Sequence, residues 1–173
     1  MFTEEEFRMP TVTQHTLRTE ETERADFPRL GNRYVLRAER SDGRFALVEQ
    51  TIPPRALAAP IHTHQREDEY SFVLAGRLGA QIGDEVVEAG PGDLILKPRG
   101  IPHAYWNPGD EETRLLEIIS PGGFEQYFAD LAPELGRPGE PDVDALAEIR
   151  ARYGLTMEMA SRRRLLEEHR LEA

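Results

Sequence analysis

The sequence predicts an all-β protein, a sandwich or barrel, with a small helical extension at its C-terminal end. Short segments rich in β-branched and aromatic residues follow one another from residue 33 to residue 119, and turns containing glycine or proline separate them every 8–12 residues or so. After residue 120 the apolar residues change to the three-to-four-residue spacing of amphipathic helices. These two periodicities, in two successive zones, indicate a β-barrel followed by helices.

Within the β zone we expect strands at residues 33–38, 45–52, 69–74, 78–82, 85–89, 93–97, 104–107 and 113–119. Only Gly83 and Asp84 separate two of these segments, which predicts a tight two-residue hairpin. The stretch after Pro60, which contains His62 and His64, is also expected to be extended.

The C-terminal zone predicts three helices, at residues 124–131, 142–153 and 161–171. Asp142 and Ser161 are placed to cap the second and third of them. We expect these helices to cover an end of the barrel. Residues 1–30 are polar and acidic and predict an N-terminal arm, so the expected organisation is an arm (1–30), a barrel (31–120) and a helical tail packed on it (121–173).

Composition narrows the classes of function. A chain of 173 residues fits one domain, and its net charge of −11 disfavours binding to nucleic acid or to an anionic membrane surface. The absence of cysteine excludes disulfides, thiolate metal sites and a cysteine nucleophile. The acidic N-terminus lacks the features of a signal peptide, so we expect a cytoplasmic protein.

Three histidines and one glutamate form the candidate site. His62 and His64 are two residues apart in an extended stretch, so both imidazoles point to the same face and can reach one metal ion. Glu69 begins an otherwise apolar strand, where an unpaired carboxylate would cost several kcal/mol. His103 follows a glycine–proline turn that can bring a third imidazole to the same point.

Each feature alone also fits simple packing, because a single histidine on a strand is usually a core residue. Zinc on the same four residues would be structural. Glu67 and Asp68 compete with Glu69 for the carboxylate role, but they fall in a turn and are expected to face water. His15 and His169 lie in polar surroundings and are expected on the surface.

Two segments resemble the two sequence motifs of the cupin superfamily. The first motif is matched by His62, His64, Glu69 and Gly76, although Ala56 stands where the motif opens with glycine. The second motif is matched throughout, by Gly92, Pro98, Gly100, His103 and Asn107. The resemblance implies a double-stranded β-helix (jelly-roll) barrel with one divalent transition metal (Fe, Mn, Ni, Co, Cu or Zn) on His62, His64, Glu69 and His103.

Among cupins, a single domain with a helical tail and Gly-Gly-Phe-Glu after the last strand is similar to the quercetin-2,3-dioxygenase-like group. In that group the metal binds a deprotonated enol or phenol, the glutamate helps to take the proton, and dioxygen cleaves the substrate. The resemblance implies that Glu69 is both ligand and catalytic base, acting on a small flavonol-like compound. By strand parity Tyr105 and Asn107, and opposite them Ser71 and Val73, are expected to line the pocket.

Two other functions stay open: a non-oxidative cupin enzyme (isomerase, cyclase or decarboxylase), and a small-molecule binding or sensor module in which the metal only anchors the ligand. The complete set of four ligands favours an enzyme. Cupins of this size are often homodimers, and the outward apolar face of Tyr70, Phe72 and Leu74 needs a cover, so a second copy of the chain is a predicted partner.

Overall fold

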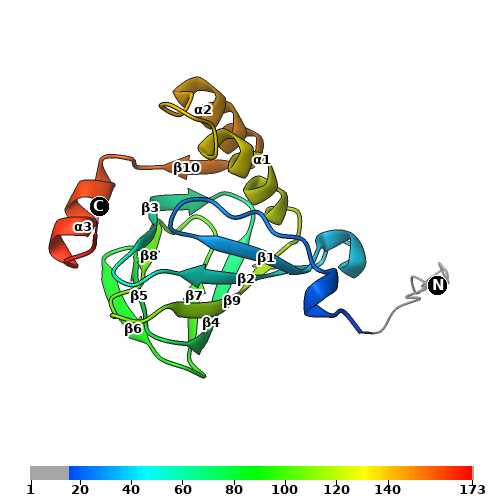
Figure 1. Cartoon of the computed structure of the whole chain (residues 1–173), viewed down its shortest axis with the longest axis horizontal. Helices are drawn as coiled ribbons and strands as arrows, with labels where there is room; N and C mark the ends of the chain where they lie inside the picture. The colour runs from blue at the N-terminus through cyan, green and yellow to red at the C-terminus, as the bar shows by residue number, and fades with distance from the viewer. Residues whose placement is uncertain (1–15, 173) are drawn as a thin grey trace, which may run out of the picture.

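The computed structural model describes residues 16–172 and shows two five-stranded antiparallel sheets that enclose the core (Figure 1). The first sheet has the order β1-β2-β9-β4-β7 and the second β10-β3-β8-β5-β6. The strands are β1 (Gly31–Leu36), β2 (Ala46–Ile52), β3 (Leu57–His64), β4 (Asp68–Ala75), β5 (Leu78–Ile82), β6 (Glu85–Ala89), β7 (Leu94–Lys97), β8 (His103–Trp106), β9 (Thr113–Ser120) and β10 (Leu155–Met157).

Alternation along the strands explains this arrangement. In β2 every second residue, from Ala46 to Ile52, is buried while the residues between are partly exposed. Apolar side chains from both sheets, among them Val73, Leu115 and Leu78, meet in one core cluster. The predicted all-β barrel with C-terminal helices is therefore confirmed, as is the hairpin at Gly83 and Asp84, where Ile82 pairs with Glu85 and Gly83 has a φ of 57°.

The second sheet departs from the expected strands at β3 and β10. β3 runs from Leu57, well before Pro60, and β10 pairs with its far end so that Leu155 lies opposite His64 and Met157 opposite His62. A three-residue strand in a helical zone is too short to give a period-two pattern, which is why the sequence did not predict β10. The C-terminal zone therefore adds a strand beside the two histidines.

The three predicted helices are present as α1 (Glu125–Leu135), α2 (Val143–Arg152) and α3 (Ser161–Glu168). Asp142 caps α2 as expected, its carboxylate accepting from the backbone N–H groups of Asp144 and Ala145. The predicted cap at Ser161 is wrong. Its hydroxyl group instead donates to the carbonyl of Glu158 and accepts from the N–H of Ile61, which ties α3 to β3.

The helices cover two different surfaces of the barrel (Figure 1). Phe124 and the apolar side of α1 pack with α2 and β10 over one end of the barrel. Leu165 of α3 packs on Trp106 and Ile61, on the outer face of the second sheet. Residues 1–15 of the predicted N-terminal arm lie outside the described residues, and the boundaries of arm, barrel and tail stay a prediction.

No helix between residues 16 and 172 is both long and apolar enough to cross a membrane. The outward face of β4 and β7 is apolar and exposed, at Phe72, Leu74, Leu94 and Leu96. A second copy of the chain remains our predicted cover for this face.

Candidate metal centre

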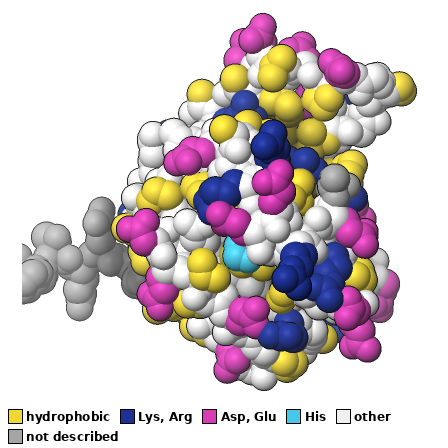
Figure 2. All heavy atoms as spheres, turned by 90° about the vertical axis from the view of Figure 1, so that its left-hand side faces the viewer, with side chains coloured by type: hydrophobic (Ala, Val, Ile, Leu, Met, Phe, Trp, Pro, Cys, Tyr) yellow, Lys and Arg dark blue, Asp and Glu magenta, His cyan; other side chains and the backbone are white. Residues whose placement is uncertain are grey.

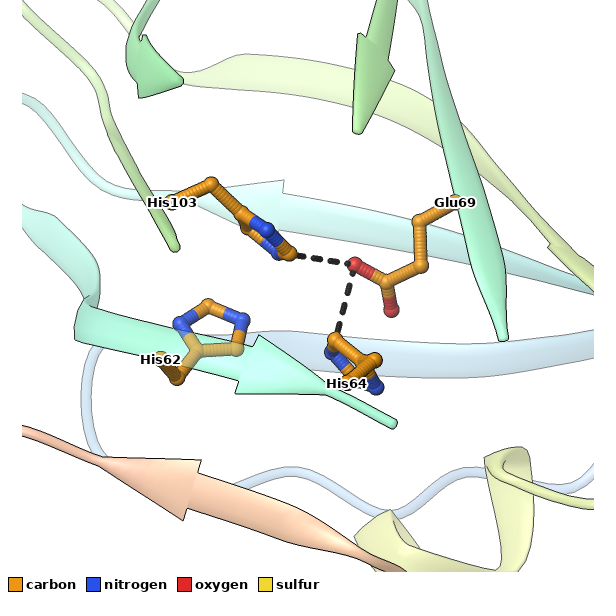
Figure 3. Close-up of side chains that lie close together, drawn as sticks. All are labelled: His62, His64, Glu69 and His103. Atoms are coloured by element: carbon orange, nitrogen blue, oxygen red, sulfur yellow. Dashed lines mark ion pairs between the residues drawn. The ribbon is translucent and has the colours of Figure 1, made fainter. Parts of the chain in front are cut away.

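His62, His64, Glu69 and His103 lie together inside the barrel (Figure 3). Each offers one ligand atom, and these four atoms all lie within 4.8 Å of one another. Four atoms bound to one metal at about 2.0–2.2 Å would span roughly 4 Å, so shifts of less than an ångström bring the set onto one ion. The structure therefore brings together, in a buried cluster, the four residues that the sequence singled out.

The strands explain this convergence. His62 and His64 share the inner face of β3, and His103 lies directly opposite His62 on β8. Glu69 reaches the same point from β4, in the other sheet. The site therefore lies between the two sheets, and either sheet alone would leave it incomplete.

Hydrogen bonds fix which nitrogen of His62 and of His103 faces the cluster. Nδ1 of His62 lies 2.8 Å from the carbonyl oxygen of Pro60, and Nδ1 of His103 lies 3.0 Å from that of Ile101. A carbonyl can only accept, so both Nδ1 atoms carry the proton and each Nε2 keeps its lone pair. Nε2 of His64 and Nε2 of His103 are buried without a hydrogen-bond partner among the described residues. Buried, unsatisfied imidazole nitrogens aimed at a carboxylate fit a bound divalent cation.

Glu69 is held by a buried cation that the sequence analysis did not single out. Nζ of Lys97 donates to Oε2 of Glu69 at 3.0 Å and to Oε2 of Glu117 at 2.9 Å, and Ser71 also donates to Glu117. Lys97 and Glu117 are each 1% exposed. Oε2 of Glu69 also lies 3.5 Å from Nε2 of His64 and 3.4 Å from Nε2 of His103. The same oxygen is therefore shared between the lysine and the histidine cluster.

Burial and neighbouring charges shift the pKa values of the ionisable residues in and around the cluster. Burial, together with the other two histidines, holds the pKa of His62 well below its usual value, and burial also lowers the pKa of His103. His64, Lys97 and His103 together outweigh burial and hold the pKa of Glu69 well below its usual range. Burial raises the pKa of Glu117 to about 7. At neutral pH the two histidines are thus neutral and Glu69 is an anion, the forms that bind metal.

His64 has a second carboxylate beside it. Oε2 of Glu67 lies 3.6 Å from Nδ1 of His64, and Glu67 is 7% exposed. The expectation that Glu67 faces water is therefore wrong, because the turn before β4 folds inward over the histidine. Asp68 begins β4 and forms an exposed ion pair with Arg99, so it points away from the cluster.

A cavity of about 440 Å³ adjoins the cluster. His62, His64 and Glu69 lie in its wall, and apolar side chains from β3, β10, α1 and α2 make up most of the rest. Phe124, just before α1, packs edge-on against the His64 ring at 4.2 Å between ring centroids. A volume of 300–1,000 Å³ with a few polar groups in an apolar wall is typical of sites for small organic molecules.

The comparisons with known proteins agree with this architecture. The sequence profile of the family Cupin_2 (Cupin domain) matches residues 48–119, which run from β2 to β9 and include all four cluster residues. Residues 48–119 are therefore a cupin domain. No curated protein is significantly similar to it in sequence.

Solved structures share the cupin fold at low sequence identity. KdgF from Halomonas sp. superposes with a TM-score of 0.58 at 18% identity, over 66% of this chain and 99% of that protein. The nucleoside dehydratase Pac13, from Streptomyces, gives 0.54 at 19% identity, over 66% and 88%. A predicted oxalate decarboxylase from Thermotoga maritima gives 0.55 at 21% identity, over 61% and 98%. These likenesses establish the fold alone.

Of the four residues expected to line the pocket, the structure places one in the cavity wall and three elsewhere. Tyr105 lies in the cavity wall, and its hydroxyl group donates to Gln50 at 3.0 Å. Ser71 is buried against Glu117, and Val73 belongs to the core. The amide of Asn107 donates to three backbone carbonyls, a structural role in the loop after β8. Strand parity gives the inward face, but it does not separate the cavity wall from the packed core.

The two remaining histidines lie apart from the cluster. His169 is only partly exposed, because its ring stacks on Trp106 at 3.9 Å between ring centroids, so the expectation of a plain surface residue is corrected. His15 lies outside the described residues.

We expect the metal-free cupin to lose stability as the pH falls from 6.5 to 5. The pKa values of His62 and His103 are lowered in the folded state, so only the unfolded chain takes up their protons below about 6.5. Glu117 acts in the opposite direction, because its raised pKa lets the folded state bind a proton below about 7. Glu117→Gln removes this proton uptake by the folded state. The free energy of unfolding should therefore fall more steeply with decreasing pH, by about 1.4 kcal/mol per pH unit. Urea unfolding at several pH values measures this, and equal slopes for the two proteins contradict it.

Proposed function

We propose that this cupin is a metal-dependent dioxygenase that acts on a small enolic or phenolic, flavonol-like compound. The observation that carries the proposal is the cavity, which joins an apolar chamber to three of the four cluster residues. An apolar chamber accepts a flat, largely unsaturated molecule, and the cluster at its wall is the place where a hydroxyl group of that molecule would be bound.

His62, His64, Glu69 and His103 would hold the metal through three neutral imidazoles and one carboxylate. A redox-active divalent metal with this ligand set supplies a Lewis acid that lowers the pKa of a bound hydroxyl group, and it leaves positions open for substrate and dioxygen. Zinc on the same residues would be the structural alternative.

Glu69 would accept the proton of the substrate hydroxyl group. Lys97 keeps Glu69 anionic and hydrogen-bonded at Oε2, so the carboxylate is fixed in place before the substrate arrives. Its lowered pKa makes Glu69 a weak base, so the transfer requires a hydroxyl group whose own pKa is lowered in the site. The hydroxyl group of Tyr105 is a poor alternative to Glu69 as proton acceptor. Burial raises its pKa well above the usual value, so it keeps its own proton.

Oxygen consumption by the metal-loaded protein tests the proposal. We expect uptake when a flavonol or a 1,3-dicarbonyl compound is added to protein loaded with iron, manganese, nickel, cobalt or copper. Glu69→Gln should lower the rate by about 100-fold or more, because the hydrogen-bonded acceptor is lost. Asp68→Asn is the matched control, since this neighbouring carboxylate points away from the cluster. If no oxygen is consumed with any of these metals, the proposed dioxygenase activity is wrong.

A non-oxidative enzyme is the second candidate. The structural neighbours include a nucleoside dehydratase and a predicted oxalate decarboxylase, and neither name describes an oxygenation. Substrate turnover without oxygen consumption would support this candidate. Ligand binding that depends on the metal, without turnover, would support a binding or sensor module.

A further inference from the structure

The cavity wall contains more positive than negative charge, in a chain whose net charge is −11. Of the described residues in that wall, Glu69 is the only carboxylate, and Lys97 already pairs with it. Three arginines also line the cavity: Arg29 before β1, Arg150 on α2 and Arg162 on α3. Three separate segments thus contribute an arginine to the wall of one apolar chamber.

α2 and α3 each contain one arginine that lines the cavity. In each helix that arginine forms no ion pair with the residues that the structure describes, whereas the other arginines of the helix do. On α2, Arg152 pairs with Asp130 at 2.8 Å, whereas Arg150 forms no such pair. On α3, Arg163 and Arg164 pair with glutamates one turn further along, whereas Arg162 forms no such pair.

Acidic residues outnumber basic ones in the chain, and most arginines between residues 16 and 172 form an ion pair with a carboxylate. Arg150 and Arg162 belong to the minority that forms none within this range. Figure 2 shows the side of the molecule on which α3 lies, with hydrophobic atoms gathered towards the α2 end and arginine groups beside them. Lys97, the only lysine of the chain, is buried, so the dark-blue groups on this face belong to arginines.

We propose that the cavity takes an aromatic or otherwise apolar molecule that carries a carboxylate, which Arg150 and Arg162 bind while the body of the molecule fills the chamber. A guanidinium group binds a carboxylate through two parallel N–H···O bonds, which an ester or a neutral hydroxyl group cannot match. The apolar wall favours a ligand whose charge is confined to one end of an apolar body. A small anion that is hydrated on all sides would lose its water without gaining apolar contacts. That the opposite end of the molecule is an enol or phenol rests on the proposed function.

Three naphthalene probes separate the contribution of the carboxylate to binding from that of the apolar ring system. 6-Hydroxy-2-naphthoic acid has a phenol at one end and a carboxylate at the other, its methyl ester lacks the charge, and 2-naphthol lacks the whole group. Binding is measured by fluorescence titration of zinc-loaded protein, in which zinc supports no redox turnover. We expect the acid to bind roughly tenfold more tightly than the ester, as for one or two charge-assisted hydrogen bonds, and the difference to shrink as salt is raised.

The double variant Arg150→Gln/Arg162→Gln should remove most of this difference and leave the affinity for the ester and 2-naphthol unchanged. The control Arg163→Gln/Arg164→Gln removes the same charge from α3 outside the cavity and should keep the preference for the acid. Equal binding of acid and ester to the unmodified protein, or equal losses in the two double variants, overturns the inference. Because the readout is binding, a preference for the acid supports the inference even if oxygen uptake is never seen.

Discussion

Replacing His62 or His103 by alanine is expected to lower the affinity of the protein for a divalent metal by at least about 100-fold, with the fold retained. Mutation of groups that only orient a ligand typically costs 10–100-fold, and these two residues supply ligand atoms themselves. Each Nδ1 is already bonded to a backbone carbonyl, so each Nε2 is left to act as the ligand atom. Elemental analysis of the purified proteins and calorimetric titration of the metal-free forms measure the effect.

His169→Ala is the control for this experiment. His169 stacks on Trp106 beneath α3 and lies outside the cluster, so its removal should leave metal stoichiometry and affinity unchanged. Circular dichroism establishes that each variant is folded. One metal ion per chain in the parent protein and an equal content in His62→Ala or His103→Ala would contradict the assignment of the site.

The sequence predicted the four cluster residues because each belongs to a local pattern. His62 and His64 are two residues apart on one strand, and Glu69 and His103 stand at fixed positions in the cupin motifs. Most strand boundaries followed in the same way, from alternation and turn residues. These features depend on neighbours along the chain, so they are visible without the fold.

The lysine behind Glu69 depends on the pairing of strands that are distant in sequence. Lys97 meets Glu69 because β7 pairs with β4, and Glu117 joins them because β9 lies on the other side of β4. The local pattern is misleading here. Leu94 and Leu96 would be taken as the inward face of β7, yet they are 48% and 54% exposed while Lys97 is 1% exposed. The one available signal was that Lys97 is the only lysine in a chain rich in arginine.

The cavity and its arginines could not be predicted for a similar reason. Arg150 and Arg162 come from helices whose positions depend on β10 and on the bond between Ser161 and β3. Neither feature has a sequence pattern long enough to recognise.

Replacing Lys97 by methionine is expected to destabilise the fold by about 3–5 kcal/mol. Methionine keeps the length of the side chain but removes the cation that bonds both Glu69 and Glu117, which leaves two carboxylates buried within the barrel. Glu117→Gln in the same chain removes one of these charges. The double variant should therefore recover part of the loss, with a coupling energy of about 1–3 kcal/mol in a double-mutant cycle. Unfolding in urea at pH 8, above the pKa of about 7 that Glu117 has in the parent protein, measures all four proteins.

Arg99→Met is the matched control, because Arg99 lies two residues further along and forms an exposed ion pair with Asp68, which points away from the cluster. An exposed pair contributes at most about 1 kcal/mol, so this variant should remain close to the parent protein. If Lys97→Met costs no more than Arg99→Met, the lysine does not hold Glu69 in the way that the distances indicate. A cost that Glu117→Gln fails to reduce would show instead that lost packing around the side chain, and not the unpaired charges, causes the destabilisation.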